Sequence, residues 1–176
     1  MGWLFSTEWM NRDALVAHLV SPGEADKRRT LAKSLRGNHL WVVQEYEDSA
    51  GQRVRFIAVY LLQGGGRDGW GYKGVEEGCG PCEKDCPLHF FELVPQPGGN
   101  HGAAWREEVR AYHAKQRASR AKLKGLKEGD ELHLPEGCTP RVLKITSVNP
   151  LQGVAGGVVY RVQPRYVKLA EIVPAT

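Results

Sequence analysis

Hydrophobic and polar positions in the first part of the chain predict two helices. Apolar residues recur at spacings of three and four from about residue 8 up to Pro22-Gly23, where the pattern ends. Ser6 or Thr7 precedes this run and is expected to cap the helix. A shorter polar stretch, 25–35, is predicted to form a second helix.

The pattern then changes from helical spacing to alternation, which predicts a β-hairpin. Two runs, 40–46 and 53–62, are rich in apolar residues, with alternation in "RVRFIAVYLL", and a polar turn joins them as antiparallel strands. The glycine-rich segment 63–78 is predicted to be a loop, and loops of this length in compact domains are usually functional or disordered. A short helix is expected at 87–94, where "PLHFFELV" begins with a proline.

The clearest predicted helix covers 103–124, where two sets of residues recur at spacings of three and four. The first set is a seam that would pack on the body of the protein: Trp105, Val109, Tyr112, Gln116, Ser119 and Leu123. The second is an adjacent stripe that is mainly cationic: Arg106, Arg110, His113, Arg117, Arg120 and Lys124.

Beyond Gly125, short β-like runs alternate with turns rich in Gly, Pro and Asn. Strands are expected at 131–134, 141–147, 158–162 and 166–169. This spacing, opening with "KEGDELHL", resembles the pattern of a small β-barrel of the Src-homology-3 type. The predicted fold is therefore α+β, with N-terminal helices and an antiparallel hairpin, a long basic helix and a barrel-like unit. Its parts would be 1–100, 101–127 and 128–176.

Composition and charge narrow the function classes. The chain is 41% hydrophobic and 25% charged, as expected of a soluble globular protein. No apolar run reaches the roughly 18 residues of a membrane span, and no export signal is recognisable, so we expect a cytoplasmic protein without a membrane partner. Segment 103–127 holds eight Lys or Arg against two Glu, whereas the rest of the chain is slightly acidic. The predicted long helix is therefore a candidate contact surface for a phosphate backbone.

Three of the four cysteines lie in "CGPCEKDCPLH", residues 79–89, and this cluster has more than one interpretation. In the simplest, which we favour, Cys86 caps the helix that begins at Pro87, and no cofactor is bound. In the second, four ligands hold a zinc ion in a structural module: Cys79, Cys82, Cys86 and His89. A chelator would then lower the melting temperature markedly.

A third interpretation is thiol chemistry. Cys79-Gly80-Pro81-Cys82 resembles the active-site tetrapeptide of thioredoxins, and the loop 69–86 could form a thiol-dependent or redox enzyme site. Its catalytic set would be Tyr72, Lys73, Glu77 and Cys86, with Cys86 as an activated thiolate at a helix N-terminus. The chain has no Gly-Lys-Ser/Thr phosphate loop, Gly-x-Ser-x-Gly elbow or His-Glu-x-x-His pair, which favours a binding protein over an enzyme.

The start "MGWLF", the hairpin and the block "WGYKGVEEGCGPCEKDCPLHFFELVP" together resemble a family of small uncharacterised proteins carried by phages, plasmids and other bacterial mobile elements. The resemblance covers roughly residues 1–110. Its most specific residues are Gly71-Tyr72-Lys73, Glu77, Gly80-Pro81 and Asp85-Cys86-Pro87. It implies a mobile-element setting, in which small proteins without catalytic motifs are often accessory binders.

We therefore expect a non-enzymatic accessory binding protein of a bacterial mobile element. Its basic helix would engage nucleic acid or a host nucleoprotein or defence complex, in an anti-restriction or anti-CRISPR role. The partner-binding residues would be Arg106, Arg110, Arg117, Arg120 and Lys124. Charge reversal at Arg110, Arg117 and Arg120 is expected to abolish binding without unfolding the protein.

Overall fold

The structure, a computed structural model, describes residues 2–9, 11–23 and 27–175. The chain forms two compact units, Met1–His113 and Ala114–Thr176, and the boundary between them lies within the long helix α3 (Gly99–Gly125). The predicted basic helix is thus a single element, as expected, but its first part belongs to the N-terminal unit and its last part to the C-terminal unit. The mixed α+β class is confirmed, with two antiparallel sheets and one long helix.

The N-terminal unit is built on a five-stranded antiparallel sheet with the order β1-β5-β4-β3-β2. Its strands are β1 (Leu4–Ser6), β2 (Arg29–Arg36), β3 (His39–Glu47), β4 (Arg53–Gly64) and β5 (Trp70–Glu76). Its helices, besides the start of α3, are α1 (Arg12–Val20), α2 (Phe90–Leu93) and two 3-10 turns, η1 (Gly66–Asp68) and η2 (Glu77–Cys79). The predicted hairpin is confirmed, because β3 and β4 pair along their length.

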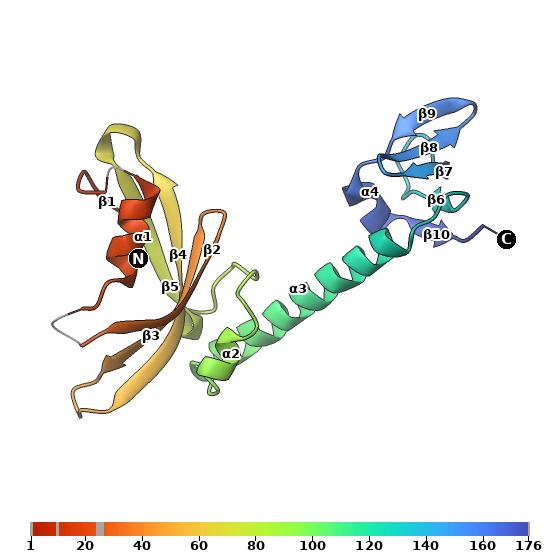
Figure 1. Ribbon diagram of the computed structural model, residues 1–176. Coiled ribbons are helices and arrows are strands. Elements are labelled where there is room, and N and C mark those ends of the chain that lie inside the picture. The colour runs from red at the N-terminus through yellow and green to blue at the C-terminus, as the bar shows by residue number, and fades with distance from the viewer. Residues whose placement is uncertain (1, 10, 24–26, 176) are drawn as a thin grey trace. The chain divides into compact units, whose positions relative to one another are not determined.

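Both faces of this sheet are covered, which explains why β3 is buried over most of its length. On one face Trp41 and Val43 pack with Phe90, Trp105 and Val109 from α2 and α3. On the other face, β3 and β4 pack against α1, through Leu40, Val42, Ala58, Leu62, Leu15 and Leu19. Figure 1 shows α1 on one side of the sheet and α2 with the start of α3 on the other. Successive side chains of β3 therefore point to opposite faces of the sheet and belong to two separate hydrophobic clusters.

The first helix begins later than the sequence predicted. Neither Ser6 nor Thr7 caps it, because Ser6 is part of β1 and pairs with Trp70 of β5. Asn11 is the N-cap, and its side-chain oxygen accepts a hydrogen bond of 2.9 Å from the backbone N–H of Ala14. Asparagine is as good an N-cap as serine, so the local chemistry alone did not distinguish the two starts.

Three strands of this sheet were not predicted: β1, β2 and β5. Residues 29–35, expected to be helical, lie in β2, which pairs with β3 through a register shift between Thr30 and Ala32. The shift lets both Leu31 and Ala32 pack on the same cluster, which removes the alternation that marks a strand. The first residues of the predicted helix, 25 and 26, lie outside the described residues.

Another of the unpredicted strands, β5, lies in the segment that was expected to be a loop. It pairs with both β4 and β1, although Gly71 and Gly74 lower its β propensity. Glycine is required at position 71, because a Cβ there would lie 2.4 Å from Cδ1 of Phe5 and 2.6 Å from the carbonyl oxygen of Leu4. Gly71 therefore weakens the sequence signal for a strand, but it also allows β1 to pack closely against β5.

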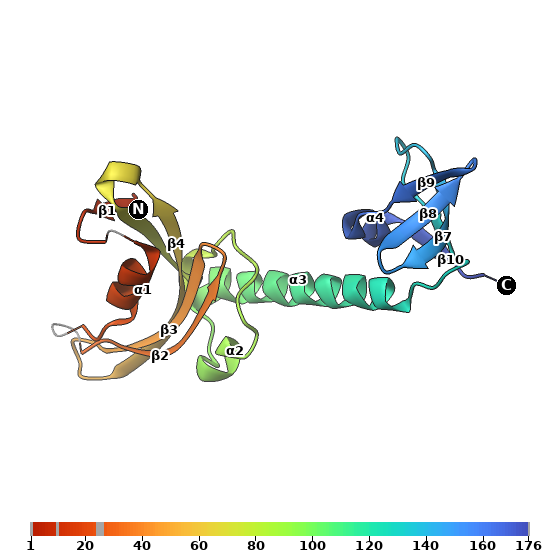
Figure 2. The same cartoon turned by 45° about the horizontal axis from the view of Figure 1, so that its top comes forward.

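The C-terminal unit contains a second five-stranded antiparallel sheet, with the order β10-β6-β7-β8-β9. Its elements are β6 (Glu131–His133), β7 (Val142–Val148), β8 (Leu151–Ala155), β9 (Val158–Arg161), α4 (Pro164–Leu169) and β10 (Glu171–Val173). The sheet packs around a small core that includes Leu132, Ile145 and Val167. The expected closed barrel is not observed: within the described part of this unit, β9 and β10 are the two edges of an open sheet (Figure 2).

The segment predicted as the last strand, 166–169, is instead the end of helix α4. Pro164 starts this helix, and proline is favoured at the first helical position because no partner for its nitrogen is needed there. Val167 is fully buried, whereas Leu169 is 67% exposed, so only one side of the helix meets the core. A strand that was not predicted, β10, follows just beyond, and β8 occupies a segment that was expected to be a turn.

Candidate nucleic-acid interface

The cysteine segment 77–89, called here the cysteine loop, is attached to the core of the N-terminal unit by Cys86. This residue is fully buried with Trp41, Phe90 and Trp105. Its carbonyl oxygen accepts a hydrogen bond of 2.8 Å from Nε2 of His113. Cys86 does not cap a helix, because α2 begins only at Phe90 and has His89 at its N-cap position. The predicted role of Cys86 as a helix cap is therefore wrong, and Cys86 is instead a residue of the hydrophobic core.

Burial of Cys86 also rules against the activated thiolate. Removal from water raises the pKa of this thiol far above its ordinary value, and the negative charges of Glu77 and Asp85 raise it further. The predicted catalytic set is not assembled as a whole around Cys86: Tyr72 packs on the α1 face of the sheet, and Cys86 lies on the opposite face. Glu77 is held in a buried ion pair. The four predicted residues therefore do not form a single site, because the sheet separates Tyr72 from Cys86.

Glu77 and Arg106 form an ion pair with side chains only 3% and 4% exposed. Nη2 of Arg106 donates to both carboxylate oxygens of Glu77, at 2.9 and 3.0 Å, and Nε donates at 3.3 Å. Arg106 also donates to the carbonyl oxygens of Pro95 and Gln96, and the backbone N–H of Gly98 donates to Glu77 at 2.6 Å. Arg106, predicted to contact a partner, is therefore a buried structural residue.

Other residues of the same loop hold it against the sheet and α3. Asp85 accepts a hydrogen bond of 3.1 Å from Nε1 of Trp41 and lies 3.0 Å from Nδ1 of His39. The carbonyl oxygen of Glu83 accepts from Nε1 of Trp105 at 3.0 Å. Glu77, Asp85 and Cys86, three of the residues that carry the family resemblance, have a structural role in this fold.

The four proposed zinc ligands differ in their surroundings. Cys79 and Cys82 are exposed and Cys86 is buried, while the His89 ring packs edge-on against Phe90 at 4.8 Å. Among the residues that the structure describes, no group of three or more His, Cys, Asp or Glu side chains is close enough to hold a metal ion. Zinc binding stays a prediction, for which the effect of a chelator on melting temperature is the test.

Thiol alkylation is expected to separate these cysteines. At pH 8, iodoacetamide should modify Cys79 and Cys82 readily and leave Cys86 unmodified until the N-terminal unit unfolds, because a buried neutral thiol is a poor nucleophile. Peptide mass spectrometry over a time course, with and without denaturant, measures each site. Preferential modification of Cys86 in the folded protein would instead support the thiol-enzyme hypothesis.

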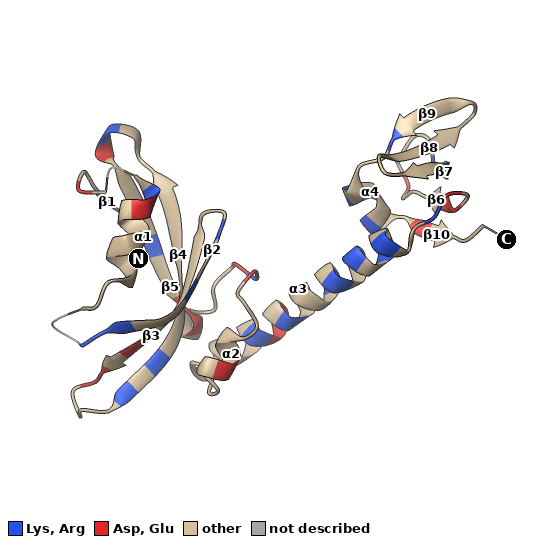
Figure 3. Cartoon of the chain, in the orientation of Figure 1, with Lys and Arg blue, Asp and Glu red and all other residues tan. Residues whose placement is uncertain are grey.

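The exposed charge of α3 is concentrated in its later part. Residues 110–127 contain seven Lys or Arg and no Asp or Glu, and Figure 3 shows the basic positions along the helix. Arg117, Arg120 and Lys124 are exposed, and none of them forms an ion pair with another described residue. We call these three residues the α3 cations.

The other residues of the predicted stripe and seam do not all have the exposure that the sequence predicted. Arg110 pairs with Glu107 and lies 5.4 Å from the centroid of the Phe91 ring, and His113 is half-buried against Cys86. Trp105 and Val109 are buried as predicted, whereas Tyr112 is 37% exposed and does not continue the seam. The available stripe therefore consists of the α3 cations, with Arg110 partly engaged.

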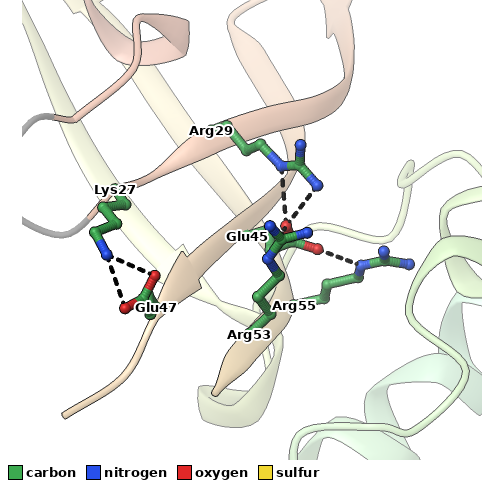
Figure 4. A network of polar contacts seen from close by, with 6 residues as sticks. All are labelled: Lys27, Arg29, Glu45, Glu47, Arg53 and Arg55. Atoms are coloured by element: carbon green, nitrogen blue, oxygen red, sulfur yellow. Dashed lines mark hydrogen bonds and ion pairs between the residues drawn. The ribbon is translucent and has the colours of Figure 1, made fainter. Parts of the chain in front are cut away.

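A second group of cations, not predicted from the sequence, surrounds Glu45 at one end of the N-terminal sheet (Figure 4). Arg29 and Arg55 contact the Glu45 carboxylate at 2.7 and 2.8 Å, and Arg53 lies 3.9 Å away. The Arg55 hydrogen bond is the main cause of a lowered pKa at Glu45, opposed by burial and assisted by Arg29. Because Arg29 and Arg55 stand opposite Glu45 in the strand register, this group joins β2, β3 and β4. The Glu45 carboxylate therefore neutralises part of the positive charge of the three arginines.

Comparison of the chain with known protein families, curated proteins and solved structures finds no match. Among the helices that the structure describes, none is long and apolar enough to cross a membrane.

Proposed function

We propose that the protein is a non-enzymatic nucleic-acid-binding protein, acting as an accessory factor of a bacterial mobile element, and that the α3 cations contact the phosphate backbone. One observation carries the proposal: 110–127 is an 18-residue stretch with seven cations and no anion, and three of its exposed cations, Arg117, Arg120 and Lys124, form no ion pair with another described residue. Such cations release condensed counterions when they meet phosphates, and this release drives binding.

The spacing of the cations suits a backbone contact. Arg117 and Lys124 are seven residues apart, so they point almost the same way and are separated by about 10.5 Å along the helix. Arg120 lies between them on the same side. Contacts of this kind position a protein on nucleic acid without reading bases, so we expect binding that tolerates many sequences.

The cations around Glu45 fit this role less well. Arg29 and Arg55 are each held by the Glu45 carboxylate, and Lys27 is held by Glu47 at 2.9 Å. A phosphate would have to compete with these carboxylates. The α3 cations meet no such competitor, which is why we assign the contact to the helix.

We also propose that the C-terminal unit is a module of the Src-homology-3 type. Two features support this: its first and last strands, β6 and β10, pair side by side, and the helical turn α4 precedes the last strand. A fold of this type does not define a function by itself, so it adds no activity to the proposal. Engagement of a host defence complex, in an anti-restriction or anti-CRISPR role, would follow from nucleic-acid binding in the mobile-element setting.

The test is the salt dependence of binding. Replacing Arg117, Arg120 and Lys124 by Gln should weaken binding to a fluorescein-labelled random duplex and reduce the slope of log K against log salt by roughly 2.7, or 0.9 for each cation removed. Fluorescence anisotropy over a salt series measures both quantities, and circular dichroism checks that the helix remains folded.

A charge-matched control separates the helix from the overall charge. Replacing Lys33, Arg67 and Lys144 by Gln removes the same number of exposed cations from the strands and turns. This variant should keep nearly the wild-type slope. Equal losses in the two triple variants, or a wild-type protein that binds neither duplex nor single strand, would overturn the proposal.

A further inference from the structure

The C-terminal unit contains a pocket of about 310 Å³ between β9, α4 and the turn that joins β6 to β7. Tyr160 on β9 and Tyr166 on α4 line it, and Leu134 and Leu143 belong to the core beneath. Figure 2 shows α4 and β9 in this unit. The volume falls in the usual range for a small-molecule site, about 300–1,000 Å³.

The chemistry of the lining favours an aromatic ligand with a negative group. Arg161 is the one charged residue among the described lining residues, and no carboxylate lines the pocket. Arg165 stands 5.0 Å from the centroid of the Tyr166 ring. Two aromatic rings next to two guanidinium groups match a planar base and its phosphate, because bases stack on aromatic side chains and phosphates pair with arginine.

The pocket is also connected to the basic helix. Nζ of Lys122, in the last turns of α3, donates a hydrogen bond to the carbonyl oxygen of Ala170, the residue that ends α4. The helix that carries Tyr166 is therefore fixed directly to the helix that carries the α3 cations. The α3 cations and the pocket therefore belong to the same unit, so a nucleic-acid strand bound by those cations would lie on the unit that contains the pocket.

We propose that this pocket binds an unpaired nucleobase, stacked with Tyr160 and Tyr166, with its phosphate near Arg161 and Arg165. The inference deepens the proposed function and rests on it, since it names single-stranded nucleic acid, or an unpaired segment, as the preferred ligand. Stacking requires no particular base, because every base has a π-face, so the preference is for strandedness and not for sequence.

Cys138 gives a direct test, because it lines the pocket and is half-buried. In a variant with Cys79→Ser and Cys82→Ser, the remaining accessible thiol is Cys138, since Cys86 is buried. A dT oligonucleotide, or a thymidine mononucleotide at high concentration, should slow alkylation of Cys138 several-fold. A blunt duplex or inorganic phosphate should leave the rate unchanged.

Substitution of the stacking residue is the second test. Tyr160→Leu should weaken binding of a dT oligonucleotide by roughly 5- to 150-fold, the usual range for loss of one stacked base, and leave the salt slope unchanged because no charge is removed. Tyr160→Phe should keep most of the affinity. Tyr112→Leu removes an exposed tyrosine outside the pocket and should have no effect.

The outcomes separate this inference from the proposed function. If the α3 cations are needed for binding but no nucleotide protects Cys138 and Tyr160→Leu has no effect, the pocket assignment is wrong and the helix assignment stands. If a mononucleotide protects Cys138 although the α3 variant binds normally, the pocket stands and the helix assignment fails. Protection by a proline-rich peptide alone would show that the pocket takes a peptide and overturn the inference.

Discussion

Arg106→Met is expected to destabilise the N-terminal unit by about 3–5 kcal/mol, the usual cost of leaving one charge of a buried pair without its partner. The Glu77 carboxylate would keep only the backbone N–H of Gly98 as a donor among the contacts described above. The carbonyl oxygens of Pro95 and Gln96 would lose their donor as well. The large effect therefore combines an uncompensated charge with unsatisfied backbone groups.

Urea unfolding followed by tryptophan fluorescence measures this loss in the full chain. All five tryptophans lie in the N-terminal unit, so the signal reports on that unit alone. Arg110→Met is the matched control, because this arginine is on the same helix but its side chain is 50% exposed. Its effect should stay within about 1 kcal/mol.

A double variant tests the mechanism of the loss. Glu77→Gln combined with Arg106→Met removes both charges and keeps an oxygen that can accept from Gly98. It should be more stable than Arg106→Met alone, since no unpaired charge is left buried. A double variant as unstable as the single one would show that the backbone contacts of Arg106, and not its charge, hold the cysteine loop.

Trp105→Ala is expected to cost about 3–5 kcal/mol, as large aromatic-to-alanine changes in cores do. The Trp105 ring is fully enclosed between two aromatic neighbours, with centroids 5.7 Å from Trp41 and 5.8 Å from Phe91. Its removal would leave a cavity and also free the carbonyl oxygen of Glu83 from its hydrogen bond. The same fluorescence assay measures the change with the four remaining tryptophans.

Two further variants serve as comparisons for Trp105→Ala. Trp105→Phe keeps an aromatic ring but loses the Nε1 donor, so its cost should be clearly smaller than that of the alanine variant. Trp3→Ala, at a residue that is 41% exposed and precedes β1, should change stability by less than about 0.5 kcal/mol. In Trp105→Ala, Cys86 should also become reactive toward iodoacetamide, because the two side chains share one cluster. Stability unchanged in Trp105→Ala would mean that α3 does not anchor this core.

The elements that sequence patterns predicted correctly are those with a strong local period. Helix α3 has a 3.6-residue repeat over most of its length, and the β3–β4 hairpin has apolar strands around a polar turn. Strands β2 and β5 lack such a repeat, because a register shift interrupts one and glycines occur in the other. Their formation depends on hydrogen bonds to neighbouring strands, which no local pattern records.

For the candidate sites, too, some features follow from the local sequence and others only from the tertiary structure. The sequence by itself determined the mixed α+β class, the long helix and the concentration of positive charge in it, since each depends on residues near one another in the chain. Only the tertiary structure decided which of those charges are available: it buried Arg106 against Glu77, 29 residues away, and left Arg117, Arg120 and Lys124 exposed. It also brought Tyr160 and Tyr166 together around one pocket. Burial and contact between distant residues depend on packing, and packing is not a property of any single segment.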